Sequence, residues 1–147
     1  MIDIRLATGA DAPEMKQLND LFNGGGSNTT EAIAESLAKN GQEIVCVAAD
    51  GDRLVGFCCG QVLSSMCYSY QFAEITELYV AAEYRRQGIG RELLKITEYE
   101  LSKRGAKHFH ILTGSENLTA QALYHSCGYG DTSEILLDKD FVASHLN

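Results

Sequence analysis

The sequence predicts an α/β domain with a mixed β-sheet, and three observations support this fold class. Strand-like and helix-like segments alternate along most of the chain, as is typical of α/β domains. With 45% hydrophobic and 22% charged residues, a chain of 147 residues can bury a sizeable core. A strand also runs into a helix through a tight glycine turn between Phe72 and Leu94. We expect one domain over residues 1–147, since the chain leaves no room for a second.

The expected elements follow from hydrophobic periodicity and from turn and cap residues. The expected strands are Ile2–Ala7, Glu43–Ala49, Leu54–Ser64, Phe72–Val80, Lys107–Thr113 and Ser133–Leu137. The expected helices are Ala12–Phe22, Thr30–Lys39, Arg91–Arg104 and Leu118–Cys127. Thr29 or Thr30 is expected to cap the second helix, and Gly41 to end it. The loops 22–30 and 64–70 carry no recognisable motif and are expected to face a substrate.

The glycine turn is the most informative local feature. Gly88 and Gly90 flank Ile89 directly before a helical segment, so the helix is expected to begin at the glycines. Unpaired backbone N–H groups and the positive end of the helix dipole make such a turn a site for a phosphate or pyrophosphate. Arg85 and Arg86 add positive charge beside it.

Two well-known phosphate loops do not fit this segment. A Walker loop needs Lys and Ser or Thr after its last glycine, but Gly90 is followed by Arg91 and Glu92. A dinucleotide fingerprint needs a third glycine, but that position is Leu93. An ordinary strand-to-helix connection remains an alternative.

The segment RRQGIG, residues 85–90, resembles the Arg/Gln-x-x-Gly-x-Gly loop of the GNAT superfamily of acyl-CoA N-acyltransferases. A second match is N-x-x-A-x-x-L-Y-x-x-x-G-Y, from Asn117 to Tyr129. The plain alternative for this second segment is an amphipathic helix with Asn117 as its N-cap and Gly128 as its stop. The resemblance covers Phe72 to Tyr129, and more loosely the start of the chain. It implies a single GNAT-like domain with a mixed sheet of six to seven strands and about four helices.

The resemblance also implies acetyl-CoA as co-substrate. The backbone of the strand before the loop would contact the pantetheine arm, and the loop would hold the pyrophosphate. The implied contacts are Leu78, Tyr79 and Val80 for pantetheine, Arg85, Arg86, Gln87, Gly88, Ile89 and Gly90 for pyrophosphate, and Asn117 for pantetheine again. Tyr124 matches the tyrosine that protonates the departing thiolate, and its phenol is protonated at neutral pH when its pKa is near ~10.

Three side chains are candidates for the general base that an ammonium acceptor requires. Glu74 has the spacing of the catalytic glutamate in histone-type members, and Glu77 matches a position that is often acidic in small-molecule members. Strand parity puts the two on opposite faces unless a bulge intervenes, as it often does in this family. His110 is the third choice. Leu112 stands where members that acetylate ribosomal-protein N-termini have a glutamate, which argues against that subclass.

Charge is distributed unevenly along the chain. Residues 85–107 hold seven of the twelve basic residues and three of the twenty acidic ones, so this segment carries +4 and the remainder −12. An acidic protein with one basic turn is a poor nucleic-acid binder but suits a compact polyphosphate. The acidic remainder favours a cationic substrate such as an amine, although acidic surface residues without a function give the same count.

Other features exclude further classes of protein. The sequence shows no membrane-spanning run and no leader, so a cytoplasmic protein is expected. The odd number of cysteines without a Cys-x-x-Cys pair suits reduced thiols that are mostly buried, with Cys58 and Cys59 on opposite faces of a strand. His108 and His110 share a strand face, but no third ligand is near, so no metal site is expected. A homodimer is the base-rate expectation.

The sequence thus predicts a cytoplasmic N-acetyltransferase in which a primary amine attacks the thioester of acetyl-CoA directly. A non-catalytic CoA-binding sensor or interaction module on the same fold is the alternative. The presence of Tyr124 and Glu74 favours the enzyme, because a module that only binds CoA could dispense with both. The acceptor stays open among small amines, antibiotics, amino acids and protein amines.

Overall fold

The computed structural model describes residues 1–142, and contacts divide the chain into two compact units, Met1–Gly114 and Ser115–Asn147. The first unit contains, in chain order, β1 (Ile2–Leu6), η1 (Gly9–Asp11), α1 (Ala12–Asn23), α2 (Thr30–Lys39), β2 (Glu43–Asp50), β3 (Arg53–Leu63), β4 (Gln71–Val80), η2 (Ala82–Tyr84), α3 (Ile89–Lys103) and β5 (Ala106–Ile111). The second unit contains α4 (Leu118–Ser126).

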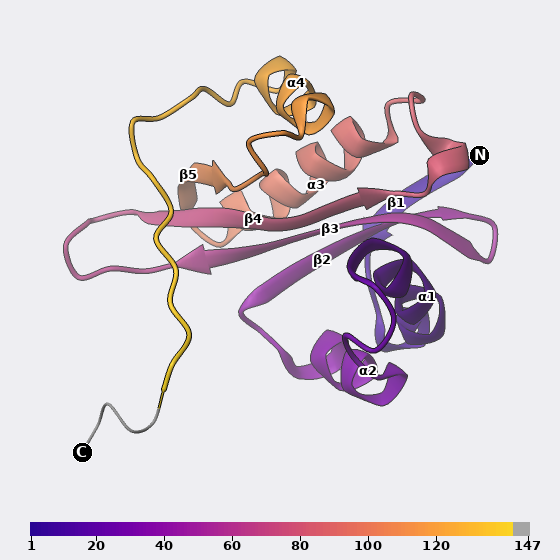
Figure 1. Ribbon diagram of the computed structural model, residues 1–147. Helices are drawn as coiled ribbons and strands as arrows, with labels where there is room; N and C mark the ends of the chain where they lie inside the picture. The colour runs from indigo at the N-terminus through magenta and orange to yellow at the C-terminus, as the bar shows by residue number, and fades with distance from the viewer. Residues whose placement is uncertain (143–147) are drawn as a thin grey trace. The chain divides into compact units, whose positions relative to one another are not determined.

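The five strands form one mixed sheet in the order β1-β2-β3-β4-β5 (Figure 1). The first four strands are antiparallel to their neighbours, and β5 runs parallel to β4. Helices α1 and α2 cover one face of this sheet and α3 covers the other (Figure 1). The predicted α/β class, the mixed sheet and the four α-helices are confirmed.

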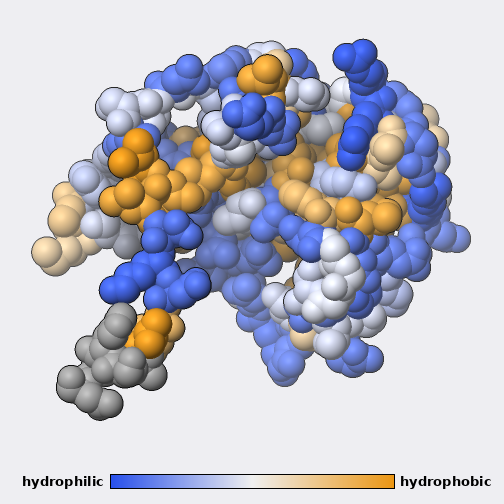
Figure 2. Space-filling view, in the orientation of Figure 1, coloured by the Kyte–Doolittle hydropathy of each residue, from blue (hydrophilic) through white to orange (hydrophobic). Residues whose placement is uncertain are grey.

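The predicted number of strands is wrong, because residues 1–142 contain five strands and not six to seven. Ser133–Leu137, predicted as the last strand, forms neither strand nor helix. Its apolar side chains are exposed, with 80% of Ile135 and 82% of Leu137 open to solvent. In Figure 2 hydrophobic residues also gather at the end of the described chain, beside the grey ones. A β-prone segment becomes a strand only when a second strand pairs with it, and no described residue does so here.

Both faces of the sheet are packed. The layer beneath α1 and α2 is built from apolar residues of both helices and the sheet, among them Met15, Leu18, Val47 and Phe57. On the other face Leu93, Leu94 and Leu101 of α3 are fully buried. Gly56 faces α3, where a Cβ would lie 3.1 Å from Leu93 Cδ1 of that helix and 2.9 Å from the Tyr79 carbonyl oxygen of β4. The close approach of α3 to the sheet therefore depends on a residue without a side chain.

The adjacent thiols Cys58 and Cys59 lie on opposite faces of β3, as predicted. Cys58 interacts with Thr97 of α3, whereas Cys59 belongs to the layer beneath α1 and α2. Burial raises the pKa of Cys58 to about 12 and that of Cys59 well above its ordinary value. Both thiols are therefore protonated and unreactive at neutral pH.

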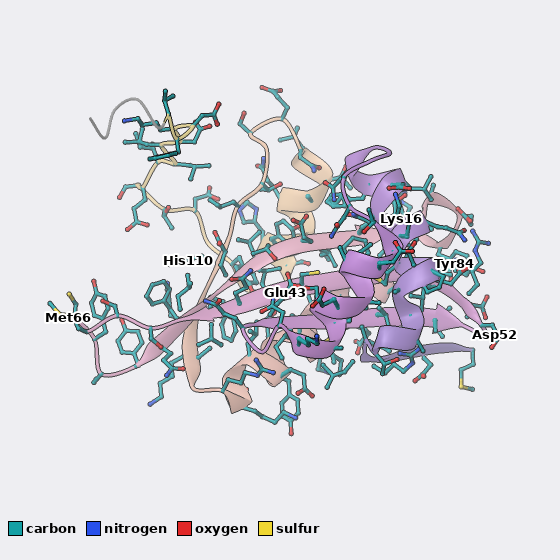
Figure 3. All side chains as sticks on the ribbon, turned by 90° about the horizontal axis from the view of Figure 1, so that it is seen from below. Lys16, Glu43, Asp52, Met66, Tyr84 and His110 are labelled. Atoms are coloured by element: carbon teal, nitrogen blue, oxygen red, sulfur yellow. The ribbon has the colours of Figure 1, made fainter. Side chains whose placement is uncertain are left out.

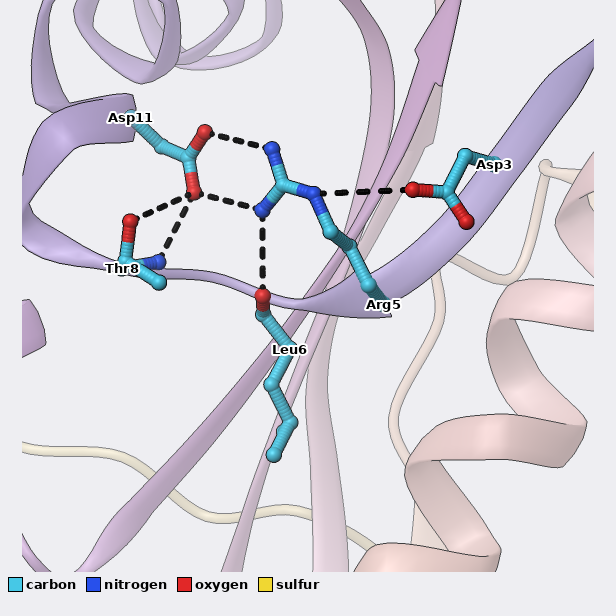
Figure 4. A network of polar contacts seen from close by, with 5 residues as sticks. All are labelled: Asp3, Arg5, Leu6, Thr8 and Asp11. Carbon is cyan, nitrogen blue, oxygen red and sulfur yellow. Dashed lines mark hydrogen bonds and ion pairs between the residues drawn. The ribbon is translucent and has the colours of Figure 1, made fainter.

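A partly buried ion pair fixes the first strand to the turn before α1 (Figure 4). The two terminal nitrogens of Arg5 donate to the two carboxylate oxygens of Asp11 at 2.8 and 2.9 Å. The backbone N–H of Thr8 donates to the same carboxylate at 2.8 Å. These hydrogen bonds hold the pKa of Asp11 below its usual range despite its burial. The pair orients α1 over the sheet.

Candidate active site

A β-bulge in β4 places both candidate glutamates on one face of the sheet. Glu77 pairs with Cys59 of β3, but the next pair along is Ile75 with Gly60, so Thr76 is an extra residue without a partner in the register. Glu74 then pairs with Gln61. Because Cys59 and Gln61 are two residues apart on a regular stretch of β3, Glu74 and Glu77 share the face that α1 and α2 cover.

A row of polar residues crosses this face from β2 to β5. Glu43 of β2 pairs with Gln61, Gln61 with Glu74, and Glu74 with His110 of β5. The His110 ring contacts the Phe72 ring, with centroids 5.6 Å apart, and meets the His108 ring edge-on at 4.9 Å. Glu74 and His110, two of the predicted candidates for the base, are thus register partners on neighbouring strands. Glu43 was not among the predicted site residues.

A cavity of about 190 Å³ lies between this face and the helices α1 and α2. Its floor is the sheet, where Glu43, Glu77 and Cys59 line it (Figure 3 labels Glu43). The other lining residues come from both helices, from the loop between them and from the sheet: Met15, Asn19, Asn23, Asn28, Ile33, Ser36, Leu37, Val45 and Phe57. Two carboxylates and three amides are therefore the main polar groups of a cavity that no basic side chain lines.

The two carboxylates of the cavity share an electrostatic environment. Burial raises the pKa of Glu77. Burial, and in second place the negative charge of Glu77, raises the pKa of Glu43. Within residues 1–142 neither carboxylate forms a hydrogen bond or an ion pair. Two partly buried anions that repel each other attract a cation into the cavity.

Strand β4 extends beyond its parallel partner. The last register pair between the two strands is Ile75 with Ile111, whereas β4 continues to Val80. The edge of β4 that carries Leu78 and Tyr79 is therefore not paired with β5. The Tyr79 ring packs inward, with its centroid 5.3 Å from that of Phe22 of α1. The packing of Tyr79 fixes the end of β4, and the edge of β4 opposite β3 is left without a β5 partner there.

Helix α3 begins at the glycine turn after β4, as the sequence predicts. Gly88 is the N-cap of α3 with φ 83°, and Arg86 is the one non-glycine residue with positive φ among residues 1–142. Left-handed residues at alternate positions direct backbone N–H groups into one concavity, which binds anions. A Cβ on Gly88 would meet no heavy atom within 4 Å, so the space beside it is open. The buried Ile89 side chain, 5% exposed, anchors the turn.

The two arginines of the turn differ in their contacts. Nε of Arg85 donates to the carbonyl oxygen of Val80 at 2.8 Å, and its guanidinium lies 5.6 Å from the centre of the Tyr79 ring. Arg85 therefore fastens the turn to the end of β4. Arg86 and Gln87 are exposed to solvent. The preceding turn η2 is held by Tyr84, which Figure 3 labels and whose hydroxyl donates to Asp50 at 2.8 Å.

In the second unit, Asn117 and Tyr124 occupy the two ends of α4. The side chain of Asn117 caps the helix by accepting the N–H of Ala120 at 3.1 Å. The helix ends at Ser126, and Gly128 follows the C-cap Cys127 with φ 98°. The N–H of Tyr129 then donates to the carbonyl of Tyr124 at 3.0 Å. The rings of these two tyrosines also meet edge to face, which is the contact that accompanies this type of helix end. Both predicted capping roles are confirmed.

The comparison with protein families decides the identity of the fold. A family profile described as Acetyltransferase (GNAT) family matches residues 13–129. The chain belongs to the GNAT acetyltransferase family. It is therefore an N-acetyltransferase of a family that uses acyl-CoA.

Relatives of this GNAT acetyltransferase act on different acceptors. It is 27% identical to aminoglycoside N(6')-acetyltransferase type 1 of Klebsiella aerogenes over 74% of this chain and 72% of the relative. It is 36% identical to the [ribosomal protein bS18]-alanine N-acetyltransferase of Escherichia coli K12, over 42% of this chain and 41% of the relative. Similarity to relatives therefore points to no single acceptor.

Solved structures agree with the fold of this GNAT acetyltransferase. An aminoglycoside acetyltransferase from an uncultured soil metagenomic sample, in complex with sisomicin, superposes with a TM-score of 0.81 at 20% identity and 96% coverage of both chains. The enzyme AAC(6')-Iy, in complex with a bisubstrate analogue of CoA and acetylneamine, gives a TM-score of 0.83 at 16% identity, covering 97% of this chain and 99% of its own.

Two further properties concern metals and membranes. Within residues 1–142 no three His, Cys, Asp or Glu side chains come together as a metal site would require. No helix in the same range is long and apolar enough to cross a membrane.

The sequence did contain a sign that Glu43, which the sequence analysis missed, faces the site. Glu43, Val45 and Val47 alternate along β2 and therefore share one face of the strand.

Proposed function

We propose that this GNAT acetyltransferase transfers the acetyl group of acetyl-CoA to a primary amine by direct attack of the amine on the thioester. The observation that carries the proposal is the bulge at Thr76, which puts Glu74 and Glu77 on one face of the strand that leads into the glycine turn. Strand β4 thus carries the carboxylates that would meet the amine, and it leads into the turn whose N–H groups would bind the phosphates. The cytoplasmic location and the homodimer remain predictions.

In this proposal the segment from Leu78 to Gly90 binds acetyl-CoA. The backbone of Leu78, Tyr79 and Val80 is suited to pantetheine, because this edge is not paired with β5. The turn from Arg85 to Gly90 is suited to the pyrophosphate, because its left-handed residues turn N–H groups toward an open space. Asn117 would contact pantetheine through the side-chain N–H groups that its capping role leaves over.

The chemical step requires three proton transfers. Glu74 accepts a proton from the incoming ammonium, with His110 of the adjacent strand as the alternative base. The amine nitrogen forms a bond to the thioester carbon, and the bond from that carbon to sulfur breaks. Tyr124 gives its hydroxyl proton to the departing thiolate. The acetylated nitrogen then loses its second proton, which restores the Tyr124 hydroxyl. The products are an N-acetylated amine and CoA, and the enzyme forms no covalent intermediate.

Gly88→Val tests the acetyl-CoA site. Acetyl-CoA should raise the melting temperature of the wild type, because a ligand that binds only the folded state stabilises it. Valine resists the φ of 83° at this position and would enter the open space, so the shift should disappear in a variant that remains folded. Gly25→Ala, in an open loop, is the control and should keep the shift. An unchanged shift in folded Gly88→Val would contradict the proposed cradle.

A screen of amines for CoA release in the presence of acetyl-CoA tests the catalysis. The proposal expects release with at least one class of primary amine. Binding of acetyl-CoA without release for any small amine, amino acid or peptide amine would favour the non-catalytic sensor instead.

A further inference from the structure

Glu43 of β2 has no part in the chemistry described above, yet it lines the same cavity as Glu77. The two strands that carry these residues are separated by β3, and neighbouring strands lie about 4.8 Å apart. Glu77 pairs with Cys59 and Glu43 with Gln61, two residues further along β3, so the two glutamates are diagonal neighbours across this strand. Burial, and after it the charges of both carboxylates, raises the pKa of Cys59. The two anions thus act on one small space above β3.

That space lacks a protein cation. The cavity is lined by twelve residues, none of them basic. Lys16 of the adjacent helix α1 is held by Asp20, with its Nζ 2.7 Å from both carboxylate oxygens. Two carboxylates that have given up part of their hydration without gaining a partner are costly, unless the ligand of the cavity supplies the positive charge.

We propose that Glu43 is a specificity-determining residue, which together with Glu77 holds one ammonium group of the acceptor, and that the acceptor is a small molecule with at least two ammonium groups. This inference rests on the proposed function. Asn19, Asn23 and Asn28 add neutral hydrogen-bonding groups around the same space. A cavity volume of about 190 Å³ admits a short chain or one ring.

The need for a second amine follows from acid–base chemistry. An ammonium between two carboxylates is stabilised in its charged form, so its pKa is raised. Such a group binds well but attacks a thioester poorly, because the nucleophile must be deprotonated. The amine that reacts is therefore a different one, within reach of Glu74 and His110, which lie on the same face at β4 and β5.

The test compares matched amines that differ by one ammonium group. The chain-like pair is 1,4-diaminobutane and 1-aminobutane, and the ring-like pair is 1,3-diaminocyclohexane and cyclohexylamine. For the wild type, kcat/KM should be higher for the diamine of at least one pair, and the preferred pair tells whether a linear polyamine or an amino sugar is the nearer analogue. Equal kcat/KM values within both pairs, or a peptide amine acetylated faster than either diamine, would overturn the proposal.

Glu43→Gln should remove the preference for the diamine. The KM for the diamine should rise by about 10- to 100-fold, the effect of losing one hydrogen bond between charged groups. The kcat value should stay within about twofold. The lost interaction holds the ground state and the transition state equally, so its loss does not change the barrier of the chemical step. The matched control is Glu35→Gln on helix α2, where the carboxylate binds Lys39 at the surface. If Glu43→Gln still preferred the diamine over the monoamine, Glu43 would not be the residue that determines this specificity.

A measurement without acetyl-CoA separates this inference from the proposed function. The diamine alone should raise the melting temperature of the wild type, and Glu43→Gln should lose that shift while Glu35→Gln keeps it. This result supports the cation site even if no amine is acetylated. A lack of acetylation would count against the proposed function alone. A diamine shift of equal size in wild type and Glu43→Gln would count against the cation site alone. The acetyl-CoA shift should be the same in all three proteins.

Discussion

At the scale of single residues, Tyr124 combines a packing role with the proposed chemical one. Its ring meets Tyr129 at the end of α4, and a phenylalanine would keep that contact. Tyr124→Phe should therefore fold normally and bind acetyl-CoA with nearly the same affinity. Its kcat should fall by about 10²- to 10⁴-fold, the usual value of general acid catalysis, where thiolate departure limits the rate. Unchanged turnover of a working amine would make Tyr124 a packing residue only.

The two glutamates of β4 should respond differently to the same substitution. If Glu74 is the base, Glu74→Gln should depress kcat/KM chiefly at low pH and recover as the pH approaches the pKa of the amine, since a deprotonated nucleophile needs no base. Glu77→Gln should instead raise KM for a cationic acceptor and leave kcat largely intact. The measurement is the pH profile of both variants on one substrate. A collapsed kcat for Glu77→Gln beside a normal profile for Glu74→Gln would exchange the two roles.

Glu43 should cost the protein stability at neutral pH. Its pKa is raised by burial and by Glu77, so the stability of the folded state is full below about pH 4, the ordinary pKa of a glutamate, and is lost as pH rises through the raised value. Glu43→Gln should therefore have a higher melting temperature than the wild type at pH 7. The gain should vanish near pH 4. An equal gain at both pH values would show that charge is not its cause.

At the scale of secondary-structure elements, the packing of α3 on the sheet depends on Gly56. A Cβ there would lie 2.9 Å from the Tyr79 carbonyl oxygen and 3.1 Å from Leu93 Cδ1. Leu93 is fully buried and cannot move aside. Gly56→Ala should lower stability by about 1–3 kcal/mol, as overpacking does. The measurement is the melting temperature, with Gly25→Ala as control because nothing lies within 4 Å of its Cβ. Equal stabilities of the two variants would contradict the close approach.

The elements also show what could be predicted from the sequence. Helix α2 has the predicted bounds, because its signals are local: Thr29 caps it, accepting the N–H of Ala32 at 3.1 Å. The strand predicted at Ser133–Leu137 is wrong, because pairing depends on a second strand that no local pattern reveals. The bulge at Thr76 could not be located from the sequence either, since threonine is an ordinary strand residue. The common face of Glu74 and Glu77 therefore came from the structure.

At the scale of the whole molecule, the uneven charge distribution matches two substrates of opposite sign. Residues 85–107 carry +4 and include the proposed pyrophosphate turn, whereas the remainder of the chain carries −12 and includes Glu43 and Glu77. A basic segment raises the local concentration of a polyphosphate, and an acidic one that of a polycation. An acidic protein can thus bind an anionic co-substrate without losing its attraction for an amine.

This charge division predicts a salt dependence that differs between substrates. Added salt shortens the range of electrostatic attraction, which is about 10 Å at 0.1 M. The KM values for acetyl-CoA and for a diamine should therefore both rise as sodium chloride is increased at constant pH. The control is S-acetyl-pantetheine, which lacks the charged phosphates of acetyl-CoA. Its KM should change little, because the turn from Arg85 to Gly90 has no anion to attract. A salt dependence of equal size for both thioesters would place the origin of the effect in the amine site or in the stability of the fold, and not in the basic turn.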